Sequence, residues 1–228
     1  MKTPCFVAAI GVCVLAGWTA FGDSRHQYSV LDSHWNVRAE LLVVDMPQAK
    51  ALALLPDLRD PARIDSAVTQ IMAAIDQNEA TLVGNPVVQA VDGQPGIAAP
   101  ISEKRYPTEF EPPEYSSTVY NLEPAAFHGV SWPTAFETRN TGLTFEVTPH
   151  VLQNGHWVFL EIDASRVVLA GFDDYITEVK QPKFVSLRTD TTLAVPNGQR
   201  TLLAFQKMPE AENQVELSIL QASATPIK

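Results

Sequence analysis

The sequence predicts an α+β protein that is rich in β-strands and has two helices on the N-terminal side of its folded part. Residues 48–77 repeat apolar side chains at helical spacing, whereas from Ala80 onward short apolar runs and alternating runs indicate strands. Residues 142–162, GLTFEVTPHVLQNGHWVFLEI, place two alternating runs around Asn154-Gly155, a pair that strongly favours a β-hairpin.

Residues 1–22 have the pattern of a secretory signal peptide. An apolar run over residues 6–18 is followed by Ala20-Phe21-Gly22, which suits cleavage. The run is shorter than the about 20 residues of a transmembrane helix, so we expect cleavage, with a retained anchor as the alternative. Cleavage after Gly22 would remove Cys5 and Cys13, the only cysteines. We therefore expect a core without disulfides, no Cys nucleophile and no Cys-ligated metal.

The charge of the chain limits its partners. The formal net charge is −10, and no basic cluster interrupts it. Binding to nucleic acid or to an anionic membrane surface needs Lys and Arg, so neither is expected. After the signal peptide, no later apolar run approaches spanning length. We expect an exported protein, periplasmic or associated with the outer membrane, whose membrane contact is at most peripheral or made through assembly.

The N-terminal part is predicted to be a linker, a strand and two helices. Residues 23–36 are polar and read as the linker, and residues 37–46 are a strand rich in Val and Leu. Pro47 and Pro56 mark the start and the end of a first helix. A second helix is predicted to begin with Asp60 as its cap and Pro61 at its first position. Its apolar face consists of Ile64, Val68, Ile71 and Ile75.

The β part covers residues 80–228, and the whole folded domain is expected to cover residues 37–228, with 37–79 as the strand-helix-helix part. Two short strands flank a turn at Asp92-Gly93. Residues 106–134 carry five prolines and predict a long irregular loop or an extended edge, because proline removes ladder donors. The stretch GFDDY (171–175) reads as a short connection in a turn.

The hairpin register can be derived from its turn. With Asn154-Gly155 as the loop, Val151, Pro149, Val147 and Phe145 face Val158, Leu160, Ile162 and Ala164, which makes one face apolar on both strands. On the other face Leu152 meets Trp157, His150 meets Phe159, and Glu146 meets Asp163. We expect the proline-rich segment or another subunit to cover the aromatic end of that face. The facing carboxylates of Glu146 and Asp163 would repel each other unless a basic side chain or a bound cation lies nearby. A basic side chain is the favoured interpretation.

No motif supports catalysis or a cofactor. The five histidines lack ligand spacing, so no metal site is predicted, and neither a phosphate loop nor a dinucleotide fingerprint is present. Asp173-Asp174, or the acidic residues Glu109, Glu111 and Glu114, could suggest paired carboxylates for glycoside hydrolysis. Solvated acids in a turn and in a loop are the favoured interpretation.

Four stretches resemble the core domain of secretins, the channel proteins of type II and type III secretion and of type IV pili. They are GNPVVQAVDGQPG (84–96), TGLTFEVTPHVLQNGHWVFLEI (141–162), RTDTTLAVPNGQRTLLAF (188–205) and QVELSILQASATPI (214–227). With the preceding strand and helices, the likeness extends over residues 37–228. It implies a β-rich core sheet that packs against itself and against neighbouring subunits.

The chain also departs from the secretin pattern. Ala204-Phe205 stands where the family carries Gly-Gly, and the proline-rich segment and GFDDY occupy the place of the hairpins that line the family's gate. The N-terminal ring domains are not recognised. The resemblance therefore implies a non-enzymatic envelope component that self-associates or pairs with other secretion or pilus proteins, in preference to an autonomous channel.

Two other functions stay open. One is a module that binds a peptide or glycan through residues 106–120, and the other is a hydrolase that uses Asp173 or Asp174. The expected interaction surface consists of six residues: Leu152, Trp157, Phe159, Tyr106, Phe110 and Tyr115.

Overall fold

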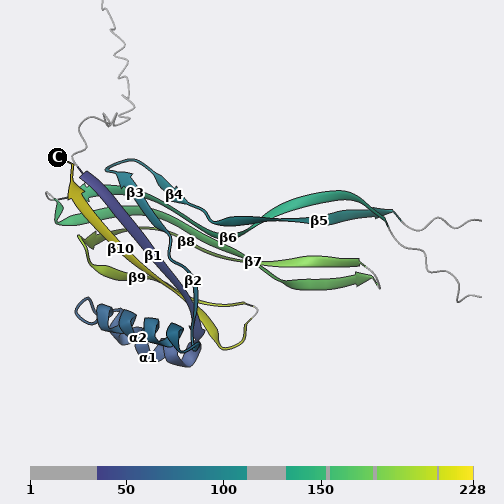
Figure 1. Ribbon diagram of the computed structural model, residues 1–228, viewed down its shortest axis with the longest axis horizontal. Helices are drawn as coiled ribbons and strands as arrows, with labels where there is room; N and C mark the ends of the chain where they lie inside the picture. Colours follow the sequence, from purple (N-terminus) through teal and green to yellow (C-terminus); the bar gives the residue numbers. More distant parts are fainter. Residues whose placement is uncertain (1–34, 112–131, 153–154, 177–178, 210, 228) are drawn as a thin grey trace, which may run out of the picture.

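The computed structural model describes residues 35–111, 132–152, 155–176, 179–209 and 211–227. The predicted signal peptide and most of the predicted linker lie outside these residues. Within them, ten strands and two helices form three layers: a helix pair, a first sheet (sheet A) and a second sheet (sheet B) (Figure 1). The α+β class predicted from the sequence is confirmed.

Sheet A is built from both ends of the described chain. Its order is β2 (Thr81–Gly84), β1 (Trp35–Pro47), β10 (Gln214–Pro226) and β9 (Arg200–Lys207), and β3 (Val87–Val91) pairs with β1 beyond β2. The central pair, β1 and β10, is antiparallel over its full length. The centre of sheet A therefore depends on contacts between residues far apart in the chain.

Sheet B contains the predicted hairpin. Its order is β4 (Gly96–Ala98), β6 (Trp132–Leu152), β7 (Trp157–Ile176) and β8 (Val179–Pro196), and β5 (Ile101–Glu111) pairs with β6 beyond β4. The β6–β7 register matches the predicted one at every pair, from Phe145 opposite Ala164 to Leu152 opposite Trp157.

Helices α1 (Gln48–Leu58) and α2 (Ile64–Asp76) cover the outer face of sheet A. The predicted apolar face of α2 is confirmed, since Ile64, Val68 and Ile71 are buried and Ile75 packs beside them. The helix begins three residues after its predicted first position. Asp60 instead accepts hydrogen bonds from Ala62 and Arg63 within the preceding turn, and this local bonding delays the helix.

The main core lies between the two sheets. Buried residues of β1, β3 and β10 meet the inward face of the β6–β7 hairpin and of β8, with Phe145, Leu41, Leu160 and Leu220 among the largest. The turn at Asp92-Gly93 does not close a hairpin, because it carries the chain from β3 in sheet A to β4 in sheet B.

Trp35 and Asn36 belong to β1, so the predicted linker extends too far. Trp35 packs against the core between the sheets, and its ring lies against Gly155 in the β6–β7 turn. A Cβ at Gly155 would lie 2.4 Å from that ring, and its φ of 90° also favours glycine. The tight turn and the tryptophan therefore fit together.

One prediction about the β part needs correction, and one that left two alternatives open is decided. Residues 171–174 are not in a turn, because they lie within β7, where Asp173 pairs with Gln181 and Asp174 with Lys180. The described ends of the proline-rich segment, 106–111 and 132–134, lie in the paired edge strands β5 and β6, so of the two predicted alternatives they form the extended edge and not the irregular loop. In place of the short connection expected at GFDDY, β7 and β8 form a long antiparallel pair, and β5 and β6 form a second one. Of the described residues, none forms a helix long and apolar enough to cross a bilayer.

Candidate assembly interface

Two β-arms extend from the body of the molecule (Figure 1). The last pair that joins β6 to β7 is Gly142 with Val167. Beyond it, β6 pairs only with β5, and β7 pairs only with β8. We call these the β5–β6 arm (residues 101–111 and 132–141) and the β7–β8 arm (residues 168–176 and 179–186).

The two arms part at a glycine that no other residue could replace without strain. Gly142 has φ 130°, and a Cβ there would lie 2.3 Å from the carbonyl oxygen of Pro100. The close approach of Pro100, which directly precedes β5, to β6 therefore requires glycine at this position.

The arms lie one over the other near their roots. The Tyr106 and Phe184 rings are 5.6 Å apart, and the guanidinium of Arg139 lies 5.0 Å from the Phe184 ring centroid. Arg139 also donates to the hydroxyl of Ser186 at 3.5 Å. Side chains alternate between the two faces of a strand, and the buried Phe145 and Leu187 mark the inward faces of β6 and β8. Arg139 therefore lies on the inward face of β6, whereas Phe184 lies on the outward face of β8. The β5–β6 arm thus covers the outer face of its neighbour.

The arms expose large apolar side chains that the body would bury. Trp132 is 70% exposed and Phe172 59%, and Ile101 and Phe136 are also exposed. The guanidinium of Arg105 lies 4.4 Å from the Phe136 ring centroid and covers only part of it. These side chains make the arms a candidate contact surface.

Both sides of sheet B end in open strands. Within the described residues, β8 pairs only with β7, and the outer edges of β4 and β5 have no strand partner. One carbonyl on the open side of β8 is capped, because Gln206 of β9 donates to the oxygen of Arg188 and to the hydroxyl of Thr189. The remaining edge offers backbone donors and acceptors to a further strand.

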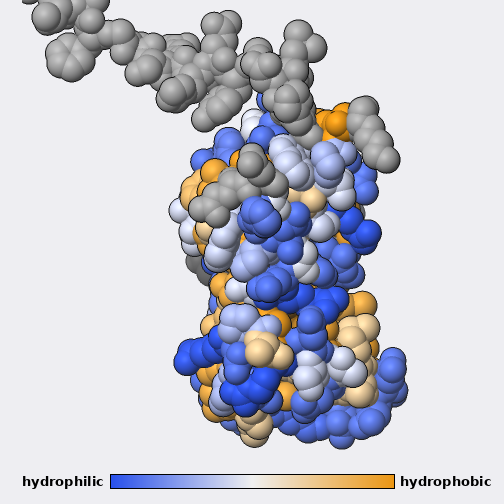
Figure 2. Space-filling view, turned by 90° about the vertical axis from the view of Figure 1, so that its left-hand side faces the viewer, coloured by the Kyte–Doolittle hydropathy of each residue, from blue (hydrophilic) through white to orange (hydrophobic). Residues whose placement is uncertain are grey.

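The predicted aromatic surface lies at the opposite end of β6 from the arms. Leu152 and Trp157 are 43% and 38% exposed, while Phe159 is half-buried beside His150. Glu111 and Trp132, the described ends of the proline-rich segment, pair at the far end of β6, so they do not cover this surface. Figure 2 views the molecule from the end away from the arms, where hydrophilic residues predominate and apolar ones appear in separate small patches.

The other predicted surface residues divide among three environments. Tyr106 is half-buried, and its hydroxyl donates to Glu137 at 3.2 Å. Desolvation, with that hydrogen bond second, raises the pKa of Tyr106. Phe110 is half-buried at the end of β5, and Tyr115 lies outside the described residues. The structure therefore does not bring Tyr106 and Phe110 together with Leu152, Trp157 and Phe159, which lie at the other end of β6.

Asp173 and Asp174 do not form a pair of facing carboxylates, while Glu109 and Glu111 lie in β5 and Glu114 lies outside the described residues. Asp173 and Asp174 are neighbours in a strand, so their side chains point to opposite faces. The facing pair Glu146 and Asp163 does have the expected basic neighbour, because Arg188 makes two hydrogen bonds to Asp163, of 2.7 and 3.2 Å. In the described part of the chain, no group of His, Cys, Asp and Glu could hold a metal ion.

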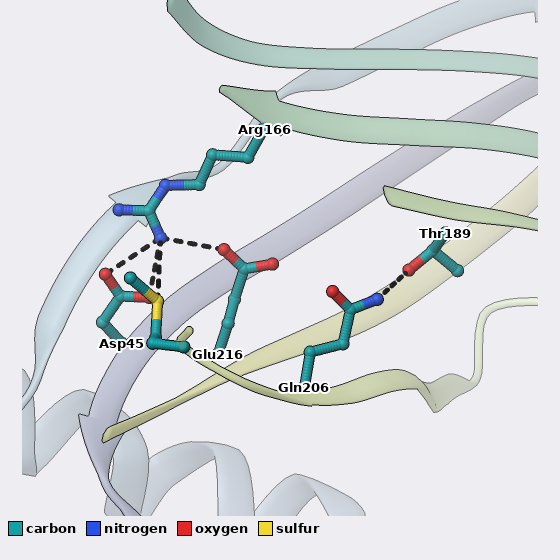
Figure 3. Close-up of polar contacts among 6 residues, drawn as sticks. Asp45, Arg166, Thr189, Gln206 and Glu216 are labelled. Carbon is teal, nitrogen blue, oxygen red and sulfur yellow. Dashed lines mark hydrogen bonds and ion pairs between the residues drawn. The ribbon is translucent and has the colours of Figure 1, made fainter. Parts of the chain in front are cut away.

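An ion cluster that the sequence analysis missed joins the two sheets where the arms begin (Figure 3). Arg166 of β7 donates through Nη1 to both oxygens of Asp45, at 2.8 and 2.9 Å, and to Glu216 at 2.8 Å. Asp45 and Glu216 face each other across β1 and β10. Their side chains are 12% and 6% exposed, and that of Arg166 is 14% exposed.

Burial and charge act against each other in this cluster. Burial lowers the pKa of Arg166, but hydrogen bonds to Asp45 and Glu216 and their charges raise it by more. For Glu216 burial prevails and raises its pKa, although Arg166 opposes the shift. One signal in the sequence points to this site: Arg166 occupies an inward position in the series Val158, Leu160, Ile162 and Ala164, where a charge needs a buried partner.

One protein-family model matches more than half of the chain. Residues 73–204 match the family model Secretin, "Bacterial type II and III secretion system protein". No curated protein matches the chain.

Several solved structures also match. The InvG secretin domain from the Salmonella SPI-1 injectisome has 11% identity over 85% of this chain and 64% of its own, with a TM-score of 0.42. Type II secretin GspD from enteropathogenic Escherichia coli has 10% identity over 83% of this chain and 69% of its own, with a TM-score of 0.42. The type IV competence pilus secretin PilQ of V. cholerae has 10% identity over 84% of this chain and 60% of its own, with a TM-score of 0.37. This chain thus spans less than two thirds of the InvG and PilQ chains.

Proposed function

The chain belongs to the secretin family of bacterial type II and III secretion system proteins, and we propose that it is a non-enzymatic structural subunit of the bacterial envelope. In this proposal it is exported, lies in the periplasm or at the outer membrane, and serves protein secretion or pilus assembly. Several copies associate side by side into a closed ring. The family match carries the proposal, and the open sides of sheet B support its mode of assembly.

Side-by-side association would satisfy the two open edges of sheet B. The outer edge of β8 in one copy can pair with the outer edge of β4 and β5 in the next, which removes unpaired backbone groups from both. The same step would bury apolar side chains of the arms, among them Trp132 and Phe172. Because sheet B is open on both sides, each copy that joins the assembly brings a new unpaired edge. Only closure of the assembly into a ring leaves no edge unpaired.

The surface of Leu152, Trp157 and Phe159 is proposed as a second contact. It belongs to the rigid body of sheet B, and two of its three side chains are exposed. A neighbouring copy or another envelope protein would cover it. The ligand-binding alternative has weaker support, because the hydroxyl and ring of Tyr106 already contact Glu137 and Phe184.

The proposal is tested by deleting the gene in its own bacterium and measuring proteins released to the medium and pili on the surface. We expect one of these to be lost and to be restored by the wild-type chain. Phe172→Asp on the β7–β8 arm should fail to restore it, whereas the matched control Leu52→Asp on α1 should succeed, since both side chains are exposed in the single chain.

The same strain separates the structural role from the hydrolase alternative. The double variant Asp173→Asn, Asp174→Asn should restore function if no catalysis is involved. Normal secretion and normal pili in the deletion strain would contradict the proposal. Loss of function in the double variant, at normal protein level and normal assembly, would favour the hydrolase instead.

A further inference from the structure

Arg166 lies at the place where β7 changes from body to arm. It pairs with Leu143 in the body, and Val167, the next residue, is the last one that pairs with β6. From Val168 onward, only β8 accompanies β7. Beyond this point the β7–β8 ribbon has no backbone pairing with the rest of sheet B, so side-chain contacts at Arg166 can influence the direction in which it leaves the body.

The side chain of Arg166 supplies a hold on the root of the ribbon by reaching across the core. Its three short bonds go to β1 and β10, the central strands of sheet A, so they connect the arm root to the opposite sheet. The Sδ atom of Met208 lies 3.9 Å from the same Nη1 atom. Gln206 makes a second, uncharged contact from sheet A to β8 near this register (Figure 3).

The charges of the cluster make this hold specific. Asp45 and Glu216 face each other in a poorly exposed site, where two carboxylates repel unless a cation lies between them. Arg166 is the cation that bonds to both. An apolar side chain could fill the same space, but it would be free to slide, whereas a guanidinium bonded to two fixed carboxylates has one position.

We propose that Arg166 is a positioning residue that sets the direction in which the β7–β8 arm leaves the body. The cluster anchors the arm to sheet A in each single chain, in addition to the contacts that Tyr106 and Arg139 make with Phe184. In the ring proposed above, it would therefore present every arm to its neighbour at the same angle. Only this last consequence rests on the proposed function.

The test measures two distances by pulsed electron paramagnetic resonance between spin labels. One pair, Met72→Cys with Phe172→Cys, joins α2 to the arm, and the other, Met72→Cys with Ile97→Cys, joins α2 to the body of sheet B. All three sites are exposed. All labelled variants also carry Cys5→Ser and Cys13→Ser, so that only the introduced cysteines react with the spin label. Dilution with excess unlabelled protein suppresses the signal from labels on different copies.

In the wild type, both distributions should be narrow. Arg166→Met should broaden or shift the distance distribution to the arm and leave the distribution to the body unchanged. The control Arg188→Met, which removes exposed ion pairs with Asp163 and Asp190, should change neither. If Arg166→Met fails to fold, the triple variant Arg166→Met, Asp45→Asn, Glu216→Gln removes the hold without leaving unpaired charge.

Unchanged distributions in the variant that folds would overturn the proposal. So would equal broadening of both, because Arg166 would then hold the sheets together in general rather than position the arm. The result does not depend on ring formation, since the distances are measured within one chain. A protein that proves to be monomeric would contradict the proposed ring and leave this test valid.

Discussion

Replacing Arg166 with Met should strongly destabilise the protein. The change leaves Asp45 and Glu216 facing each other without their cation, at side-chain exposures of 12% and 6%. Removal of one partner from a buried ion pair costs about 3–5 kcal/mol, because the remaining charge stays desolvated. The lost positive charge is the only one that bonds to these two carboxylates among the described residues.

The assay is urea unfolding at neutral pH, followed by circular dichroism, for the wild type and three variants. Arg188→Met is the matched control, because it removes an Arg–Asp pair of similar length whose side chains are 61% and 42% exposed. Such pairs contribute at most about 1 kcal/mol. The triple variant Arg166→Met, Asp45→Asn, Glu216→Gln should regain most of the lost stability.

Two results would refute this reasoning. Equal losses for Arg166→Met and Arg188→Met would mean that burial adds nothing to the inter-sheet cluster. A triple variant as unstable as Arg166→Met would mean that the loss arises from packing rather than from two unpaired carboxylates.

Three further predictions concern the turns and the pH dependence. Gly155→Ala should lower the free energy of unfolding by about 1–3 kcal/mol, since its Cβ would meet the Trp35 ring at 2.4 Å; unchanged urea unfolding would contradict this. Asn197→Ala should cost roughly 2–3 kcal/mol, at about 1 for each of its three side-chain hydrogen bonds to Gly155 and Ala224; a thermal melt like that of the wild type would count against it. The raised pKa of Glu216 means that folding favours its protonated form. The resulting contribution to folding stability is full below the ordinary pKa of 4.5 and is lost as pH rises through the pKa of the folded state. The stability of the wild type relative to Glu216→Gln should therefore fall with rising pH, and a rise would contradict the shift.

The parts that the sequence predicted well are those with one buried face. The β6–β7 register follows from apolar alternation and the Asn154-Gly155 turn, and α2 follows from apolar residues at helical spacing. In both elements the buried face leaves a periodic pattern, because each inward position needs an apolar side chain.

The arms were missed because neither of their faces is buried as a core face is. Phe172 is exposed, and Asp173 and Asp174 follow it in a strand, so no alternation distinguishes this segment from a solvated turn. The Arg166 cluster was missed for another reason. Its partners Asp45 and Glu216 lie 121 and 50 residues away in the chain, and only the packing of the two sheets brings them together.

The absolute mass of the purified protein, measured by light scattering with and without mild detergent, tests most directly whether copies join through the open sides of sheet B. We predict a large oligomer of one defined mass, which Phe172→Asp reduces to smaller species and Leu52→Asp leaves intact. A monomer in both conditions would contradict side-by-side assembly and would leave an accessory or ligand-binding role for the domain.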